Sequence, residues 1–390
     1  MQANNHLFQL ASKKPVIKTY AVHQSQKQQF WKRFFQKKAN IASIVILVIV
    51  VLASLIALFF IKNSPAKSID SNSNFVNNLP SINQLVVHNF ERGPQVDFIR
   101  EIAKLEANRA FQVNESPQFQ IIFDSALDSG GDITVNTDII TLVYNPYDLI
   151  KAINLNTDAK ISLPYTILGT NQNGVDLYAR INVSILITLT TIILAIAINI
   201  FIGFSLAAVY AFNRSKWYAN LIDKVASVLG SIPELIWIFI LCIFLGTQWY
   251  WILLAFVLIS WISYYEIAKN EISVLIKREY ISAAIVVGLN KFQITYRHLF
   301  KAILPTMLIL VVDRLAINIL IISSLAFLDL ITNENNLNIG TILKEALLSA
   351  RSNWVYITLV SLYLTAFSIS LKLFNISLAT TYYPKLALKK

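Results

Sequence analysis

The sequence predicts an all-α polytopic membrane protein with six transmembrane helices and a small extracellular α/β insertion. Of its 390 residues, 55% are hydrophobic and only 14% are charged, a composition outside the usual range of soluble globular domains. Apolar stretches of about 20 residues, the length that a helix needs to cross a bilayer core, recur along the chain. They cover residues 41–61, 183–212, 225–246, 250–267, 303–326 and 354–378.

The distribution of charge orients these spans, because Lys and Arg beside a span resist translocation. The first 40 residues carry eight basic residues and no acidic one, whereas residues 62–180 carry nine basic and thirteen acidic residues. Residues 269–301 return to six basic against two acidic residues. We therefore expect a multi-pass protein with both termini in the cytoplasm. The net charge of +11 is explained by basic residues beside the spans, which fix the topology and contact the lipid bilayer. No nucleic-acid partner is therefore expected.

The segments around the first span differ in composition. Residues 1–40 predict a basic cytoplasmic arm, whose end, Trp31–Phe35, has the pattern of an amphipathic helix at the membrane surface. The first span, 41–61, is followed by a region 62–164 expected outside the membrane. Its first part, 63–83, is rich in Asn and Ser and predicts a linker with little that builds a core.

The rest of the outer region, residues 86–163, predicts a small α/β unit. Apolar periodicity indicates helices over 94–111 and 146–154, and strand-like runs over 119–123 and 133–144. The following core, 165–385, holds five of the predicted spans and the polar loop 269–301. Residues 386–390 form a short basic tail.

The polar, basic loop 269–301 between the fourth and fifth spans is the most informative segment. Ala283, Ala284 and Gly288 lie within it, and Leu304-Pro305 opens the next span. This pattern resembles the cytoplasmic coupling loop of ABC importer permeases, in which Glu-Ala-Ala precedes a Gly and a leucine-proline. Ser282 stands where that family has the Glu, and Glu279 lies one turn earlier.

Three further segments resemble the oligopeptide and dipeptide group of these permeases. Leu168–Asp176 matches most of L-G-T-D-x-x-G-R-D, Ser231–Pro233 matches S-I-P, and Ser324–Leu328 is similar to S-L-S-F-L. The basic arm resembles that of the group's second membrane subunit, whereas residues 62–164 match nothing in it. The resemblance implies the type I permease fold in a bacterial plasma membrane.

The resemblance also implies partners. A sister permease, two ATPase subunits and a substrate-binding lipoprotein are expected, with an oligopeptide passing between the permeases by alternating access. The ATPases use ATP and Mg, and this chain has no G-x-x-x-x-G-K-[ST] phosphate loop. We expect it to be no enzyme and to bind no cofactor. Its four His and single Cys lack metal-ligand spacing, so no metal site is expected.

The resemblance and the side chains together define a predicted ATPase-coupling site. Small side chains permit close approach of a partner, and Gly288 permits either close approach or a left-handed turn. Aromatic side chains, Tyr296 among them, supply anchors for a partner groove. The predicted coupling residues are Glu279, Tyr280, Ser282, Ala283, Ala284, Gly288, Phe292, Arg297 and His298. For Arg297, a role in fixing membrane topology is the alternative.

Polar residues within the spans are the candidates for the translocation path, because a charge in hydrocarbon is costly. Glu234 follows Pro233, which removes a backbone hydrogen bond and kinks its helix. Asp313 and Arg314 are neighbours in sequence and diverge on a helix, so each is expected either to pair with another span or to snorkel toward the cytoplasmic side. Pro233, Glu234 and Asp313 are the predicted path residues.

Two alternatives remain open at this stage. In the first, the chain is a permease for another solute, such as nickel or an antimicrobial peptide. In the second, it is a membrane-anchored sensor whose outer unit binds a ligand. A sensor predicts a large cytoplasmic output domain. The predicted cytoplasmic side offers only the arm, the 33-residue loop 269–301 and a short tail, which favours the permease.

Overall fold

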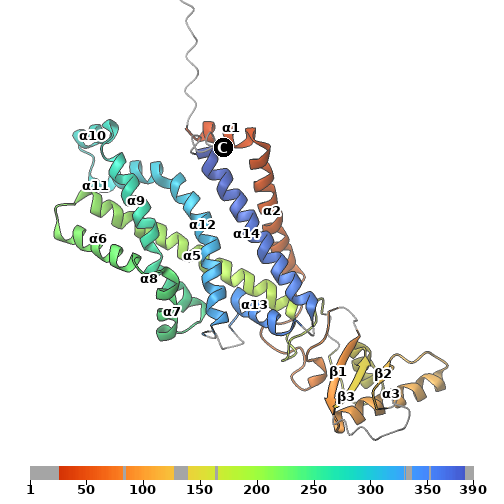
Figure 1. Ribbon diagram of the computed structural model, residues 1–390. Helices are drawn as coiled ribbons and strands as arrows, with labels where there is room; N and C mark the ends of the chain where they lie inside the picture. The colour runs from red at the N-terminus through yellow and green to blue at the C-terminus, as the bar shows by residue number, and fades with distance from the viewer. Residues whose placement is uncertain are drawn as a thin grey trace, which may run out of the picture.

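The computed structural model describes residues 26–81, 85–126, 139–162, 166–328, 330, 336–350 and 353–382. They form a bundle of long helices with a small α/β unit beyond one end (Figure 1). Five helices of the described part are long and apolar enough to cross a membrane, and one bent pair makes a sixth candidate span. The predicted fold class of a polytopic helical membrane protein with a small α/β unit is therefore confirmed.

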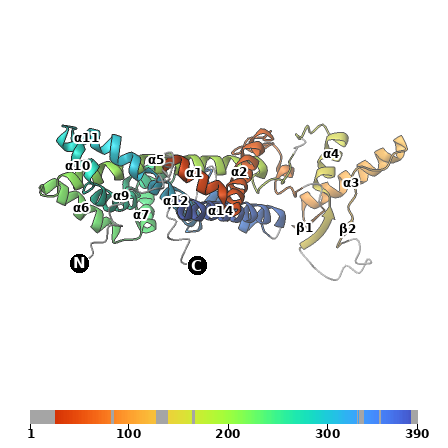
Figure 2. The same cartoon turned by 90° about the horizontal axis from the view of Figure 1, so that it is seen from above.

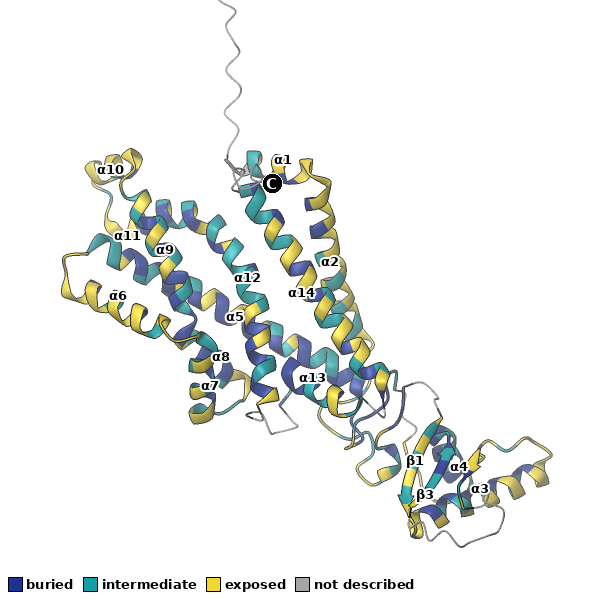
Figure 3. Cartoon of the chain, in the orientation of Figure 1, coloured by how far each residue is buried: buried dark blue, intermediate teal, exposed yellow. Residues whose placement is uncertain are grey.

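The first two helices are α1 (Gln26–Gln36) and α2 (Lys38–Phe59). The predicted amphipathic helix is present as α1, in which Phe34 is fully buried while Trp31 and Phe35 are about half exposed. The first span is α2, whose surface is largely exposed (Figure 3). Such exposure of apolar side chains is expected for a helix that faces lipid.

A stripe of small polar side chains attaches α2 to α14 (Trp354–Tyr382). Asn40 Nδ2 donates to Thr381 Oγ1 at 3.0 Å, and Ser43 Oγ donates to Ser377 Oγ at 2.9 Å. Farther along, the hydroxyls of Ser54 and Tyr363 lie 2.8 Å apart. Hydrogen bonds between small polar residues are a common means of helix association in membranes, where lipid removes most of the hydrophobic driving force.

The second span is the 36-residue helix α5 (Leu177–Phe212). At about 1.5 Å per residue it is roughly 54 Å long, well beyond the thickness of a bilayer core, and it runs obliquely through the bundle (Figure 1). It packs along the span formed by α8 (Trp249–Ile259) and α9 (Trp261–Leu275). The predicted fourth span, 250–267, thus extends farther at its C-terminal end.

The predicted third span, 225–246, is not one continuous helix. It is divided into α6 (Trp217–Gly230) and α7 (Glu234–Leu245), whose axes differ by 91°. Pro233 has no backbone N–H, and its ring excludes Ile232 from the helical region, so the helix breaks here. A kink at Pro233 was predicted, but the structure shows a complete break with a right-angled turn.

The fifth span and the segments on either side of it complete the bundle. Residues after α9 form α10 (Glu279–Val286), α11 (Lys291–Gln293) and a π-helical turn, η3 (Ile294–Leu299), which continues into α12 (Phe300–Phe327). A short helix, α13 (Ile339–Leu348), follows and was not predicted. Seen from above, α6, α9, α10 and α11 lie on one side, α2 and α14 in the middle, and the α/β unit on the other side (Figure 2).

The α/β unit holds a three-stranded antiparallel sheet in the order β1-β3-β2. Its strands are β1 (Val86–Glu91), β2 (Phe123–Asp124) and β3 (Ile139–Tyr144), and its helices are α3 (Pro94–Val113) and α4 (Pro146–Asn156). Both predicted helices are present.

The strand predictions fared less well. The run 119–123 contributes only Phe123 to a strand. Part of the run 133–144 lies outside the described residues, and β1 was missed. The burial of β1 alternates residue by residue, but His88 and Asn89 interrupt the apolar run that would have identified it.

The prediction that 63–83 is a linker that builds little core is wrong. Val76 and Leu79 are buried and belong to the core of the α/β unit, where they join Ile99 from α3 and Ile150 from α4. A 3-10 turn, η2 (Asn74–Val76), lies within it. The Asn and Ser side chains that made the segment look unstructured instead satisfy its backbone, as Ser73 Oγ does for Phe75 N.

A buried carboxylate holds the helices of the α/β unit together. Glu106 on α3 is fully buried and accepts hydrogen bonds from both Nε and Nη2 of Arg109, at 2.9 and 2.8 Å. Gln118 N and Asn156 Nδ2 donate to it at 2.9 and 2.7 Å. The hydrogen bonds from Arg109 are the main cause that lowers the pKa of Glu106 to about 2, with smaller contributions from Gln118 and Asn156.

Acid is therefore expected to weaken the α/β unit through Glu106. Because the folded-state pKa is about 2 against an ordinary 4.5, the stabilisation is complete above pH 4.5 and is lost as the pH falls toward 2. Glu106→Gln should make α3 and α4 more susceptible to proteolysis at pH 7, while pepsin at pH 2 should cleave both proteins equally. A difference that persists at pH 2 would contradict a role for the carboxylate charge.

Candidate functional site

The predicted coupling segment lies at the end of the bundle opposite the α/β unit (Figure 1). Its helix α10 begins after Arg278, whose backbone is extended, and Glu279 in the first turn complements the positive end of the helix dipole. Ile281 is completely buried and fixes α10 to the bundle. The helix is therefore anchored by one side and has little other cover, as its exposed surface in Figure 3 shows.

Large apolar side chains gather on the uncovered side of this segment. Val286 and Val287 at the end of α10 are 86% and 82% exposed, and Phe292 on α11 is 69% exposed. Tyr280 and Ile285 are about half exposed. Several exposed large apolar side chains on one short segment are typical of a protein–protein contact.

Gly288 determines how the chain turns between α10 and α11. Its φ is +89°, in the left-handed region that side chains with a Cβ rarely adopt. A Cβ at this position would have no neighbouring atom within 4 Å. Of the two roles predicted for Gly288, the structure therefore supports the left-handed turn, and within the described chain no close approach requires the glycine.

A capping box begins the next helix two residues later. Asn290 Oδ1 accepts from Gln293 N at 2.7 Å, and the Gln293 side chain accepts from Asn290 N at 3.2 Å. Lys291 Nζ donates to Asn213 Oδ1 at 2.9 Å, which ties α11 to the end of α5. The turn is thus fixed on both sides of Gly288.

The remaining predicted coupling residues lie on the same segment. Ser282 and Ala283 are exposed on α10 and Ala284 is half-buried, while Arg297 and His298 lie on η3, exposed and half-buried respectively. The structure brings these residues together at one end of the bundle. Their contact with an ATPase remains a prediction.

One aromatic residue predicted as a partner anchor, Tyr296, also makes contacts within the chain. The hydroxyl of Tyr296 lies 2.7 Å from Ser205 Oγ on α5. Its ring packs against Phe201 and Phe204 of α5 and against Phe292. Tyr296 is therefore half-buried against α5, whereas Phe292 stays exposed, and contact of either residue with a partner remains a prediction.

Glu234, Asp313 and Arg314 each pair with a charged residue of another helix. Glu234, the first residue of α7, lies 2.5 Å from Nη1 of Arg314 on α12 and also accepts a hydrogen bond from Ser260 Oγ. Asp313 points elsewhere and lies 3.5 Å from Nζ of Lys372 on α14. Pro233 creates the break that places Glu234 beside Arg314. Whether these residues line a translocation path remains a prediction.

The segment Leu168–Asp176 connects residues 63–83 to the start of α5 through backbone contacts. Gly169 has a φ of +80°, and a Cβ there would lie 2.0 Å from the carbonyl oxygen of Leu79. Thr170 N donates to that same carbonyl at 3.1 Å, and Asn78 N donates to the Asn171 carbonyl at 2.8 Å. The glycine is therefore required because two backbone segments meet here.

The same segment joins the ends of the first two spans. Asp176 caps α5 by accepting from Tyr178 N at 2.9 Å, and its other oxygen accepts from Asn63 Nδ2 at 2.8 Å. Tyr178 Oη donates to the Ala57 carbonyl of α2 at 2.8 Å. Residues separated by more than a hundred positions in sequence thus form one junction.

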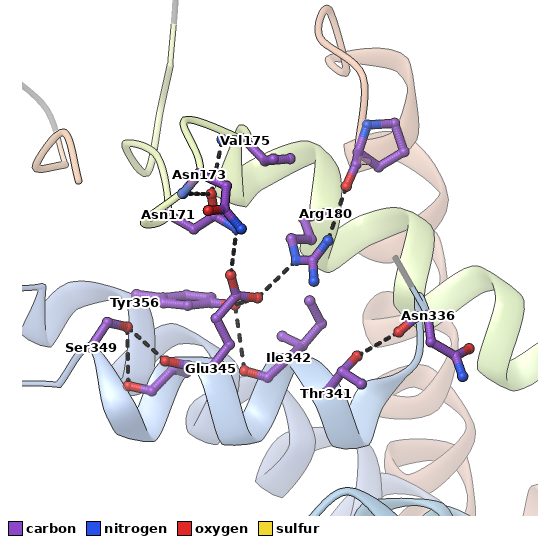
Figure 4. Close-up of polar contacts among 12 residues, drawn as sticks. Asn171, Asn173, Val175, Arg180, Asn336, Thr341, Ile342, Glu345, Ser349 and Tyr356 are labelled. Carbon is purple, nitrogen blue, oxygen red and sulfur yellow. Dashed lines mark hydrogen bonds and ion pairs between the residues drawn. The ribbon is translucent and has the colours of Figure 1, made fainter. Parts of the chain in front are cut away.

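A buried ion pair that the sequence reasoning missed lies next to this segment (Figure 4). Glu345 on α13 accepts from Arg180 Nε and from Asn171 Nδ2, both at 2.8 Å, and Tyr356 Oη lies 3.4 Å away. Only 4% of the Arg180 side chain is exposed. The sequence did contain one indication of a buried ion pair, an arginine one turn after Asp176 at the edge of an apolar run. Its partner, however, lies in α13, a helix that was not predicted.

Together, the candidate spans define a polytopic membrane protein, and the segment α10–α11 is exposed at one end of its bundle. The family described as binding-protein-dependent transport system inner membrane component matches residues 199–383. The N-terminal transmembrane domain of oligopeptide transport permease C matches residues 25–80. These two parts of the chain are therefore similar to the membrane components of binding-protein-dependent transport systems.

Individual transport permeases are similar to this chain as well. The oligopeptide transport system permease protein OppC of Haemophilus influenzae is 26% identical over 192 residues, covering 49% of this chain and 61% of that protein. The glutathione transport system permease protein GsiD of Pectobacterium atrosepticum is 23% identical over 179 residues, covering 46% and 59%. The chain thus spans about three fifths of the length of these relatives.

Among solved structures, an inward-facing form of the MetNI methionine ABC transporter is similar to this chain. The alignment has a TM-score of 0.36 and 14% sequence identity, and it covers 51% of this chain and 94% of that one.

Proposed function

We propose that this chain is the second membrane subunit of an ATP-driven importer of oligopeptides in a bacterial plasma membrane. It forms the path together with a sister permease, and two ATPase subunits supply the energy from ATP and Mg. A substrate-binding lipoprotein delivers the peptide from outside. The names of the two relatives, which refer to oligopeptide and glutathione transport, support a peptide substrate.

The observation that carries the proposal is the exposed apolar surface of α10 and α11. Val286, Val287 and Phe292 are each more than two-thirds exposed on a rigidly held segment. We assign this surface to the ATPase groove, with Glu279 and Arg297 at its polar rim. Closure of the ATPases on ATP then moves α10, and the π-helical turn transmits this movement to α12 as a rigid-body change.

The proposed orientation places α10, α1 and both termini in the cytoplasm. The basic residues of the arm and of loop 269–301 support this orientation, and the α/β unit then lies outside, where the lipoprotein arrives. Glu234 and Asp313, both paired with a basic residue of another span, are assigned to the path. Their pairing reduces the cost of holding charge within the membrane.

Co-purification tests the proposal directly. Val286→Asp should leave the chain in the membrane but reduce recovery of the ATPase subunits about tenfold or more, because it places a charge in the centre of an apolar contact. Leu155→Asp is the matched control, since Leu155 is 51% exposed on α4 of the α/β unit. The proposal fails if mass spectrometry finds no ATPase with the wild-type chain, or an equal amount with both variants.

A further inference from the structure

A cavity of about 390 Å³ lies at the break between α6 and α7. It is lined mainly by apolar side chains from α6, α7, α9 and α12, and by three charged residues, Glu234, Glu266 and Arg314. Leu320 and Ile317 on its wall are 62% and 37% exposed, so the cavity reaches the surface of this chain. Its size and its few polar groups are typical of small-ligand sites.

The charges in the cavity do not balance. Glu234 and Arg314 neutralise each other in the 2.5 Å ion pair, and Ser260 donates to the remaining oxygen of Glu234. Glu266, from α9, forms no ion pair or hydrogen bond with any residue that the structure describes. The cavity therefore carries one uncompensated negative charge inside the span Trp249–Leu275.

The position of Glu266 makes this charge available to a ligand. A Cβ on Gly230, at the end of α6, would lie 3.5 Å from Glu266 Oε1 and 3.3 Å from Ile262 Cγ2. The absence of a side chain at Gly230 leaves room beside the carboxylate. Glu266 is exposed on the surface of this chain, so a cation that enters this space can reach its carboxylate and is attracted by its charge.

We propose that this cavity binds the ammonium group of the transported solute, with Glu266 as the direct acceptor and the Glu234–Arg314 pair as a fixed neighbouring dipole. The inference rests on the proposed function, and it names the chemical group that the membrane path recognises. A peptide brings such a group at its N-terminus or on a lysine side chain. The apolar walls contact the remainder of the ligand.

Direct binding tests the site separately from transport. The purified importer in nanodiscs, without ATP or binding protein, should bind tri-alanine about tenfold more tightly than N-acetyl-tri-alanine, as expected for a hydrogen bond to a charged group. Glu266→Gln should remove this preference, whereas Glu271→Gln, on the same helix but outside the cavity, should retain it. N-acetyl-Ala-Lys-Ala distinguishes a side-chain ammonium from a terminal one.

The outcomes separate the site from the function. Equal affinity of the wild type for the free and acetylated peptides, or an unchanged preference in Glu266→Gln, overturns the ammonium site. Uptake into proteoliposomes with the complete importer is measured in parallel. Amine binding without ATP-driven uptake would overturn the proposed function and leave the site standing. Uptake by the wild type, with a binding preference that Glu266→Gln does not change, would support the function and overturn the site.

Discussion

Gly288→Val is expected to abolish ATP-driven uptake, and Gly288→Asn is expected to retain most of it. The φ of +89° costs an ordinary residue about 1–2 kcal/mol, and a β-branched residue more, while asparagine tolerates this region. Gly288→Ala should lie between the two, with uptake reduced roughly tenfold when the turn must be formed for docking. Uptake of a labelled peptide and ATPase co-purification measure the effect.

The order of the three variants distinguishes backbone strain from crowding. Asparagine is larger than alanine, so a loss of uptake that increases with side-chain size would indicate that a partner approaches Gly288 closely. A loss that follows left-handed propensity would support the turn. Membrane insertion of each variant is checked by fluorescence of a C-terminal fusion, since open space around Gly288 leaves the helix bundle itself undisturbed.

Glu345→Gln is expected to destabilise the folded chain by about 3–5 kcal/mol, the usual effect of removing one partner from a buried ion pair. The substitution leaves the charge of Arg180 without its carboxylate in a place where only 4% of the side chain is exposed. For a protein of this size the melting midpoint should fall by roughly 10 °C. Size-exclusion chromatography of detergent-solubilised protein after heating measures it.

Two further variants define the origin of that loss. Arg180→Gln combined with Glu345→Gln should recover much of the stability, because no charge is then left unpaired. Asp148→Asn breaks the 2.9 Å pair with Lys151 on α4, whose side chains are 29% and 42% exposed, and should change the midpoint little. A double variant as unstable as Glu345→Gln alone would contradict an electrostatic cause.

The spans and the turn at Gly288 were predictable because their signals are local. A run of about 20 apolar residues predicts a helix wherever it occurs, and a glycine between two polar helical segments indicates a turn. The break at Pro233 was predicted only as a kink, since the direction of α7 depends on its packing against α8. Helix α13 was missed, although Ile339, Ile342 and Ala346 show the buried face of a short helix.

The backbone contacts of Leu168–Asp176 and the buried ion pair were not predictable, because their parts are distant in sequence. Nothing near Leu79 indicates that its carbonyl accepts from Thr170, and nothing near Arg180 indicates Glu345. The Asn- and Ser-rich composition of 63–83 was misread for the same reason, since its buried residues find their partners in α3 and α4. Polar residues whose partners are remote resemble disorder in a single sequence.

The junction around Asp176 also bears on how the α/β unit is attached to the helices. Asn63 and Asp176 are hydrogen-bonded at 2.8 Å, and Ser162 N lies 3.3 Å from a carboxylate oxygen of Asp70. The chain leaves and re-enters the host protein at one point, as it does in inserted guest domains. A short connection at this junction, or another domain with closely spaced ends, could therefore replace the unit without a rearrangement of α2 and α5.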